Sequence, residues 1–353
     1  PSAATALGPV IRSHDNSHGH GTCYSNGYRR DSLTEQLKAA ADDWRDVTMM
    51  SDDQLTQRIR EDNIDILIDL SGYSSGNRLL TFARKPAPVQ VTAWGYATST
   101  GLTAMDYFLA DEVVAPAAHH RHFTERVITL PSILCYEPFA EAPDVEALPA
   151  LTRDTITFGS LNRLSKVSDR TLDTWADILK AVANARLLIK DASLSDNTQR
   201  DRLVARFKQR GIDAKRLELR GQTGQRDHLA VYNEVDIALD PFPHNGGVST
   251  FEALWMGVPV VTLRGDRVPA RVGASILTAL QYEDWIANDT TSYIAIAQQL
   301  SQNLDTLTHA RDTLRHTLQQ SVMCRHDEYC RAVEQAYRTM WRAWCESRAT
   351  LAA

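Results

Sequence analysis

Residues 240–252, DPFPHNGGVSTFE, combine residue types that suit an anion-binding turn and follow the apolar run VDIALD. Two prolines stop that run as a strand, because proline has no amide hydrogen to donate to a neighbouring strand. Gly246 and Gly247 permit positive φ and leave the backbone uncovered. The stretch therefore predicts a strand that ends at Asp240 and a bare turn after it.

A helix is predicted to begin directly after this turn, with Ser249 or Thr250 as its N-cap. Free amide hydrogens and the helix dipole both favour a phosphate at such a position. Glu252, expected in the first helical turn, can accept hydrogen bonds from ribose hydroxyls. A plain tight turn with a capping acid explains the same residues equally well.

A second candidate segment is GSLNRLSKVSD, residues 159–169, between an apolar run and a predicted helix. Asn162, Arg163 and Lys166 are expected to project from the end of a strand. A lysine there can neutralise a departing diphosphate, which stabilises a transition state electrostatically. The alternative is a solvated basic loop.

His228 lies near the start of another predicted helix. Taken alone, such a histidine is more often structural or simply exposed. Two features at strand ends of one domain nevertheless favour a nucleotide site, since ligands of open parallel sheets lie beyond the carboxyl ends of the strands.

Alternating helix-like and strand-like segments run through most of the 353 residues and predict an α/β fold with two domains. Helices are expected over 31–44, 51–63, 168–181 and 196–210, and strands over 64–70, 88–94, 106–111, 126–131, 155–161, 185–191, 216–221, 235–240 and 259–263. The expected divisions are an N-terminal lobe over 1–135, a linker over 136–154, a second lobe over 155–302 and C-terminal helices over 303–353, with a cleft between the lobes.

Composition and charge exclude several classes of protein. A formal net charge of −6 argues against nucleic acid as the main partner. No apolar run reaches the length of a membrane span, and residues 1–21 do not have the pattern of a secretory signal. Five cysteines without C-x-x-C spacing favour reduced thiols, so we expect a cytoplasmic protein.

Three long stretches, residues 64–107, 158–169 and 227–277, together resemble the catalytic region of glycosyltransferase family 41. That family comprises the protein O-GlcNAc transferases and the Spindly-like protein O-fucosyltransferases. The resemblance covers nearly the whole chain in order. It implies a GT-B fold, in which two Rossmann-like lobes face a cleft, the C-terminal lobe holds the sugar nucleotide and a final helix crosses back.

The resemblance also assigns roles by position. Lys166 matches the lysine that contacts the diphosphate and is needed for activity, His228 a histidine beside the base, and Glu252 an acid that binds ribose. The sugar-nucleotide site is expected to comprise Asn162, Arg163, His228, Asn245, Gly246, Gly247, Val248, Ser249, Thr250 and Glu252. Animal enzymes have Asn-Gln where this chain has Asn-Arg, and His-Thr-Thr at the helix start, and the second departure leaves the donor open.

In the N-terminal lobe, Gly95–Gly101 matches a loop near the sugar and the acceptor, with Tyr96, Thr98, Ser99, Thr100 and Gly101 as its candidate residues. Family members usually begin this lobe with a strand and a loop that bears a histidine. Residues 1–7 look like the segment after that histidine, so we expect a fragment whose first strand and upstream TPR repeats belong to a longer protein.

These observations predict an inverting, metal-independent transferase that moves GlcNAc from UDP-GlcNAc to Ser or Thr hydroxyls of acceptor proteins, without a cofactor. One alternative is the same fold with GDP-fucose as donor, and another is an inactive nucleotide-binding or protein-interaction module.

Clustered His14, His18, His20 and Cys23 fit no standard zinc spacing and are expected to form a polar turn, whereas residues 119–122 are expected on a helix.

Overall fold

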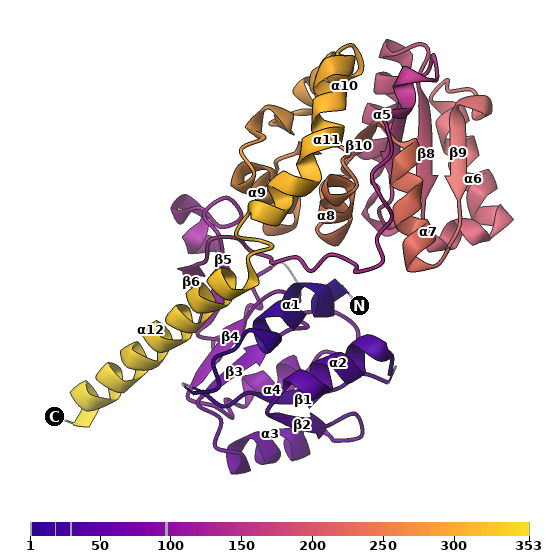
Figure 1. Ribbon diagram of the computed structural model, residues 1–353. Coiled ribbons are helices and arrows are strands. Elements are labelled where there is room, and N and C mark those ends of the chain that lie inside the picture. The colour runs from indigo at the N-terminus through magenta and orange to yellow at the C-terminus, as the bar shows by residue number, and fades with distance from the viewer. Residues whose placement is uncertain (1, 18, 29, 96–97, 353) are drawn as a thin grey trace. The chain divides into compact units, whose positions relative to one another are not determined.

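The computed structural model describes residues 2–17, 19–28, 30–95 and 98–352 (Figure 1). The chain forms two compact units. Unit 1 comprises Pro1–Glu137 and Val322–Ala353, and unit 2 comprises Pro138–Ser321. In the described residues, no helix has both the length and the apolar character needed to cross a membrane.

Unit 1 contains two parallel sheets. A two-stranded sheet pairs β1 (Thr22–Ser25) with β2 (Asp43–Asp46), and a four-stranded sheet has the order β3-β4-β5-β6. The strands of the larger sheet are β3 (Ile66–Asp69), β4 (Val89–Thr92), β5 (Tyr107–Ala110) and β6 (Arg126–Thr129). Its helices are α1 (Ser2–Arg12), α2 (Ser32–Ala40), α3 (Asp52–Glu61), α4 (Leu79–Ala83) and α12 (His326–Ala352).

The four strands predicted after residue 63 of this unit are present, but the helix predicted over 31–44 is too long. Helix α2 ends at Ala40, and residues 43–46 form β2. Asp43-Trp44-Arg45-Asp46 has no strand-like composition, so its conformation comes from pairing with β1 rather than from local propensity. Residues 119–122, expected on a helix, lie in the 3₁₀ helix η1 (Ala117–His122).

The sheet of unit 1 has an apolar cluster on each face. Val91 of β4 packs in one cluster with Tyr329, Val333 and Met340, which α12 contributes. The other cluster joins Leu67 of β3 to apolar residues of α3 and α4. Successive strand residues point to opposite faces, which explains why both clusters draw on the same sheet.

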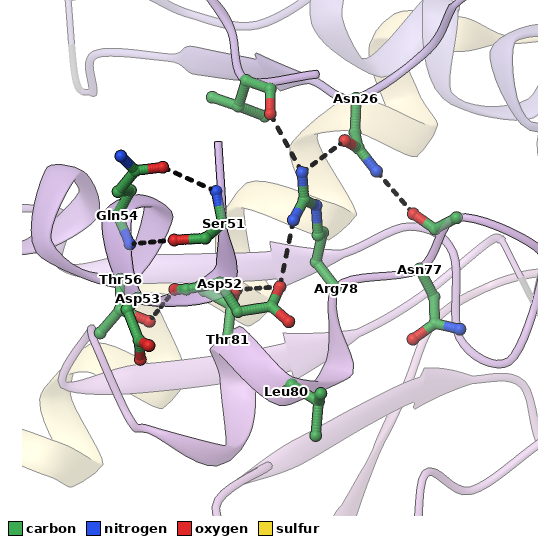
Figure 2. Close-up of polar contacts among 12 residues, drawn as sticks. Asn26, Ser51, Asp52, Asp53, Gln54, Thr56, Asn77, Arg78, Leu80 and Thr81 are labelled. Carbon is green, nitrogen blue, oxygen red and sulfur yellow. Dashed lines mark hydrogen bonds and ion pairs between the residues drawn. The ribbon is translucent and has the colours of Figure 1, made fainter. Parts of the chain in front are cut away.

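Helix α3 begins with a capping box, in which Ser51 and Gln54 satisfy each other's backbone amides (Figure 2). Beside it, the Arg78 guanidinium donates to Asn26 Oδ1 at 2.9 Å and to Asp52 Oδ1 at 3.2 Å. This network ties the start of α3 to two loops that are distant in sequence. The network therefore stabilises unit 1, and none of its residues is a predicted site residue.

Unit 2 contains a six-stranded parallel sheet of order β12-β11-β10-β7-β8-β9. Its strands are β7 (Thr157–Ser160), β8 (Arg186–Lys190), β9 (Leu217–Arg220), β10 (Ile237–Leu239), β11 (Val260–Leu263) and β12 (Ile286–Ala287). Adjacent β7 and β10 lie at the centre, so the segments that follow these two strands leave the same edge of the sheet. Those segments contain the residues that the sequence predicted for the site.

The helices of unit 2 are α5 (Asp169–Ala181), α6 (Asn197–Gln209), α7 (Gln225–Ala230), α8 (Val248–Trp255), α9 (Val272–Ala279), α10 (Thr290–Ser301) and α11 (Leu304–Gln320). Residues 303–353, expected as one set of C-terminal helices, divide between the units: α11 belongs to unit 2 and α12 to unit 1. Residues 138–154 of the expected linker belong to unit 2, where the amide of Ala150 donates to Asp236 Oδ1 at 2.9 Å.

Candidate functional site

The segments after β7 and β10 meet through several hydrogen bonds, two of which involve predicted site residues. Lys166, at the end of the 3₁₀ helix η3 (Leu164–Lys166), donates from Nζ to the carbonyl oxygen of Asn245 at 2.7 Å. The hydroxyl of Ser249 donates to Asn162 Oδ1 at 2.6 Å. The structure thus brings together the two segments that the sequence singled out independently.

The amine of Lys166 lies beside the turn at residues 245–247, which precedes α8. Burial lowers the pKa of Lys166, the charge of Asp240 raises it and the charge of nearby Arg163 lowers it further. Arg163 itself is exposed. Lys166 is therefore the basic side chain that contacts the turn before α8, and Arg163 acts on it through its charge.

The N-terminus of α8 has no side-chain cap, which corrects the prediction that Ser249 or Thr250 would cap it. The helix begins at Val248 with Gly247 as its N-cap residue, so the two hydroxyl residues lie inside the first turn. Within the part of the chain that the structure describes, the amides of Gly247, Val248 and Ser249 donate to no acceptor. Three amide hydrogens at the positive end of a helix dipole form a seat for an anion.

Two further polar atoms at this turn are buried without a hydrogen-bond partner among the described residues. They are Thr250 Oγ1, in the first turn of α8, and Asn245 Oδ1, in the segment that precedes it. Buried polar atoms without partners cost free energy, so they indicate a place where a ligand or water completes the bonding. We assign the anion seat to residues 245–250 on these two observations together.

Glycine is needed at position 246 for a reason other than the one expected. Gly246 and Gly247 do not have positive φ. A Cβ atom on Gly246 would lie 2.6 Å from Ser249 Oγ and from Thr250 Oγ1. The turn thus packs against the first turn of its own helix, and close approach rather than unusual backbone geometry excludes a side chain.

Asp240 holds the Gly246 turn through a hydrogen bond, a role that the sequence analysis missed. The amide of Gly246 donates to Asp240 Oδ1 at 2.6 Å, and the hydroxyl of Thr262 donates to Oδ2 at 2.7 Å. Burial raises the pKa of Asp240 to about 7, although both hydrogen bonds and the charge of Lys166 act to lower it. A strand-end acid with a glycine six residues onward and a threonine on the next strand is the signal that could have found it.

His228 and Glu252, predicted for the base and the ribose, also lie together. His228 Nε2 is 3.3 Å from Glu252 Oε2, and Gln225, which was not predicted, approaches Oε1 at 3.5 Å. Glu252 is the fifth residue of α8 rather than part of its first turn, because the helix starts at Val248. Its carboxylate therefore lies beyond the anion seat, toward α7.

The C-terminus of α8 is held by two arginines of α11. Arg311 donates to the carbonyl oxygen of Met256 at 3.0 Å, and Arg315 donates to that of Trp255 at 2.7 Å. Cations at this end satisfy carbonyl groups and favour the helix dipole. Two arginines therefore bind the C-terminus of α8, whereas its N-terminus has no side-chain cap and can accept an anion.

Glycosyl transferase family 41 matches residues 7–136 and 146–333, which is most of the chain. The chain belongs to glycosyltransferase family 41. The probable UDP-N-acetylglucosamine--peptide N-acetylglucosaminyltransferase SPINDLY of Solanum lycopersicum is 35% identical over 339 residues, covering 94% of this chain and 36% of that protein. The chain thus spans about a third of the length of the curated relatives it matches.

A solved mutant of the Thermobaculum terrenum O-GlcNAc transferase is 38% identical, with a TM-score of 0.94 over 99% of this chain and 66% of that one. An Anabaena protein solved with UDP-glucose has a TM-score of 0.61 and 11% identity, over 95% and 96% of the two chains, and shows the fold alone. The expected α/β fold of the GT-B class is confirmed.

The second predicted loop of this family 41 chain lies in unit 1 and rests on a buried acid. The hydroxyl of Ser99 donates to Glu125 Oε2 at 2.6 Å, and the amide of Thr100 donates to Oε1 at 2.7 Å. Gly101 has a φ of +69°, which glycine adopts without strain. Thr98 is described without an assigned contact, and Tyr96 lies outside the described residues.

The histidines near the start of the family 41 chain take part in separate contacts. His14 Nδ1 lies 2.9 Å from Glu334 Oε1, whereas His20 Nε2 lies 3.0 Å from Asp43 Oδ2. His18 lies outside the described residues. Among the residues that are described, no group of three or more His, Cys, Asp or Glu side chains has the arrangement of a metal site.

Proposed function

We propose that this chain carries the catalytic region of an enzyme that transfers GlcNAc from UDP-GlcNAc to Ser or Thr hydroxyls of proteins. The observation that carries the proposal is the open seat at residues 245–250, with Lys166 bound to its backbone. The names of its relatives, UDP-N-acetylglucosamine--peptide N-acetylglucosaminyltransferase and O-GlcNAc transferase, support the same donor and acceptor classes.

In this proposal, the diphosphate of the donor binds the free amides of Gly247, Val248 and Ser249. The acceptor hydroxyl attacks the anomeric carbon from the face opposite the diphosphate and releases its proton to solvent water, while the bond between that carbon and the diphosphate oxygen breaks. Inversion follows from this geometry. Negative charge grows on the leaving UDP, and Lys166 and the α8 dipole stabilise it.

The nucleoside end of the donor is assigned to the pair formed by α7 and α8. Glu252 offers a carboxylate to the ribose hydroxyls, and His228 presents its ring to the base. Lys166 and the helix start supply the positive potential, so we propose transfer without a metal or cofactor. We further propose that the longer protein acts in the cytoplasm and recruits its acceptor proteins through upstream TPR repeats.

Replacing Lys166 with methionine tests the proposal. We expect transfer of labelled GlcNAc to fall by roughly a hundred- to a thousandfold, because the leaving group loses its charged partner. Lys190→Met is a control for the loss of a buried amine: Lys190 ends β8 and donates from Nζ to the carbonyl oxygen of Gly221, after β9, at 2.7 Å. Equal losses in the two variants, at matched folded fractions, would contradict the assigned role of Lys166.

A donor panel tests the sugar. Calorimetry with UDP-GlcNAc and GDP-fucose should show tighter binding of UDP-GlcNAc. Preference for GDP-fucose would reassign the donor, a result compatible with Gly247 and Val248, which offer no polar side chain to the sugar. Binding of neither nucleotide would leave the chain as an interaction module and end the proposal.

A further inference from the structure

Asp240 is an ionisable group at the floor of the donor seat that the proposed chemistry does not use. Its side chain is 1% exposed and joins three elements: β10, which it ends, the Gly246 turn and Thr262 of β11. Its backbone carbonyl accepts a hydrogen bond from Tyr293 of α10 at 2.9 Å. The carboxyl group is therefore held by hydrogen bonds from two elements, and its backbone is held by a third.

The surroundings of Asp240 contain little charge to balance it. Lys166 is the cation whose charge acts on it, and α9 presents Gly273, where a Cβ atom would lie 2.5 Å from Asp240 Oδ2. His244, on the same turn, has an exposed side chain, yet desolvation and the charge of Lys166 lower its pKa to about 4, so it is neutral near pH 7. Burial raises the pKa of Asp240 to about 7, so both of its protonation states are available under ordinary conditions.

We propose that Asp240 is a positioning residue that holds the donor turn through Gly246 and takes up a proton when the donor diphosphate binds above it. The inference rests on the proposed function, because it needs an anion at the start of α8. A diphosphate brings two negative charges to a seat whose floor is this carboxyl group. Like charges disfavour the ionised acid, so the proton moves from solvent to Asp240 and the turn keeps its anchor.

Replacing Asp240 with asparagine distinguishes the role of Asp240 in holding the turn from its role in taking up a proton. The amide oxygen of asparagine can accept from Gly246, and its NH2 group can donate to Thr262 Oγ1, so both contacts survive. Alanine at the same position removes both. We expect Asp240→Asn to keep donor affinity and Asp240→Ala to lose it at least tenfold.

Proton uptake is measured by calorimetry of the 353-residue chain with UDP-GlcNAc, whose diphosphate is esterified at both ends and does not titrate near neutral pH. Binding heats are compared in two buffers of different ionisation enthalpy. Wild type should take up part of a proton at about pH 7.5 and bind roughly tenfold more weakly at pH 8.5 than at pH 6, the change expected for one pKa unit. Infrared absorption of a protonated carboxyl group should grow on binding and be absent in Asp240→Asn.

Deprotonation of Lys166 would also weaken donor binding as pH rises. The variant Thr262→Val shows whether Lys166 or Asp240 causes the fall in affinity. The Thr262 hydroxyl stabilises the ionised form of Asp240, so its removal should raise the pH at which affinity falls. Asp236→Asn is the matched control: Asp236 is a buried acid at the opposite end of β10 that accepts from Thr157 and Ala150, away from the seat. It should change neither the pH profile nor the infrared signal.

Each outcome decides one of the two proposals. Wild-type chain that binds neither UDP-GlcNAc nor GDP-fucose overturns the proposed function and the inference with it. Wild-type chain that binds UDP-GlcNAc with the same proton uptake as Asp240→Asn overturns the inference alone. If only GDP-fucose binds, the same comparison is made with GDP-fucose, and the same results decide it.

Discussion

Asp69 in unit 1 and Asp240 in unit 2 are built alike and yet serve different turns. Each is buried directly at the end of a parallel strand, and each accepts from a threonine of the neighbouring strand. Thr92 donates to Asp69 Oδ2 at 2.9 Å, and Thr262 donates to Asp240 Oδ2 at 2.7 Å. In both acids Oδ2 accepts from the next strand and Oδ1 accepts from the following turn, and in Asp69 the Gly72 amide also donates to Oδ2.

The difference lies in the turn. Asp69 accepts from the amides of Ser71 and Gly72, two and three residues onward, so its turn closes on the acid. Asp240 instead reaches Gly246, six residues onward, and the amides after Gly246 stay available at the start of α8. The comparison teaches that the length of the turn, rather than the acid, separates a closed strand end from a ligand seat.

The largest expected contrast concerns stability and pH at the open turn. Because burial raises the pKa of Asp240 from 3.8 to about 7, the folded state favours the neutral acid, and the stability this gives is lost as pH rises through that interval. About three pKa units correspond to about 4 kcal/mol. Asp240→Asn should therefore gain stability relative to wild type between about pH 4 and pH 7. Urea unfolding at several pH values checks this, and a constant difference would refute it.

Removing the acid from the closed turn should cost stability without affecting the donor. In Asp69→Ala, two amides and the Thr92 hydroxyl lose their buried acceptor, which we expect to cost about 3 kcal/mol. Donor affinity of the folded protein should stay the same, because the seat lies in unit 2. Urea unfolding together with calorimetry measures both quantities, and a parallel loss of affinity would show that the two turns are not independent.

Adding one methyl group to the open turn should weaken donor binding. Gly246→Ala places Cβ against Ser249 Oγ and Thr250 Oγ1, so the seat must shift and affinity should fall roughly ten- to a hundredfold. Gly211→Ala is the control, since Gly211 has a φ of +79° but nothing within 4 Å of its added Cβ. It should lower stability alone. Unchanged UDP-GlcNAc affinity in Gly246→Ala would mean that the close packing does not shape the seat.

The smallest effects are expected for the two threonines. Thr92→Val and Thr262→Val each remove one hydrogen bond to a buried acid, at a cost of about 1 kcal/mol. The loss should be larger for Thr262→Val, because Asp240 then keeps only the Gly246 amide whereas Asp69 keeps both turn amides. Thermal unfolding compares the pair, and the reverse order would contradict the view that the closed turn is the better bonded one.

The strands that carry the site could be predicted because each is a short apolar run. Residues 155–161 and 235–240 contain β7 and β10, and the segments after them contain Lys166 and the Gly246 turn. Apolar runs bounded by turn residues are sufficient to predict a strand that is buried on both faces. The prediction of which segments leave the ligand edge of the sheet followed from these runs.

Local sequence could not predict contacts that depend on distant pairing. The β2 strand forms only because β1 lies beside it, and the bonds of Arg311 to the end of α8 cross more than fifty residues. The predicted N-cap of α8, Ser249 or Thr250, lies two or three residues after the observed one, Gly247, for a related reason. The Ser249 hydroxyl bonds Asn162 of another segment instead of capping its own helix, and tertiary contacts of this kind override capping preference.

The division of the chain into units has a consequence for its synthesis. Unit 2 is one continuous segment, whereas unit 1 needs both ends of the chain. Tyr329, Val333 and Met340 of α12 are fully buried in the core of unit 1, so that core stays incomplete until α12 has left the ribosome. Domains usually fold in the order of their synthesis. Here unit 2 can fold before unit 1 is complete, because the N-terminal part of unit 1 must wait for α12, which is synthesised after unit 2.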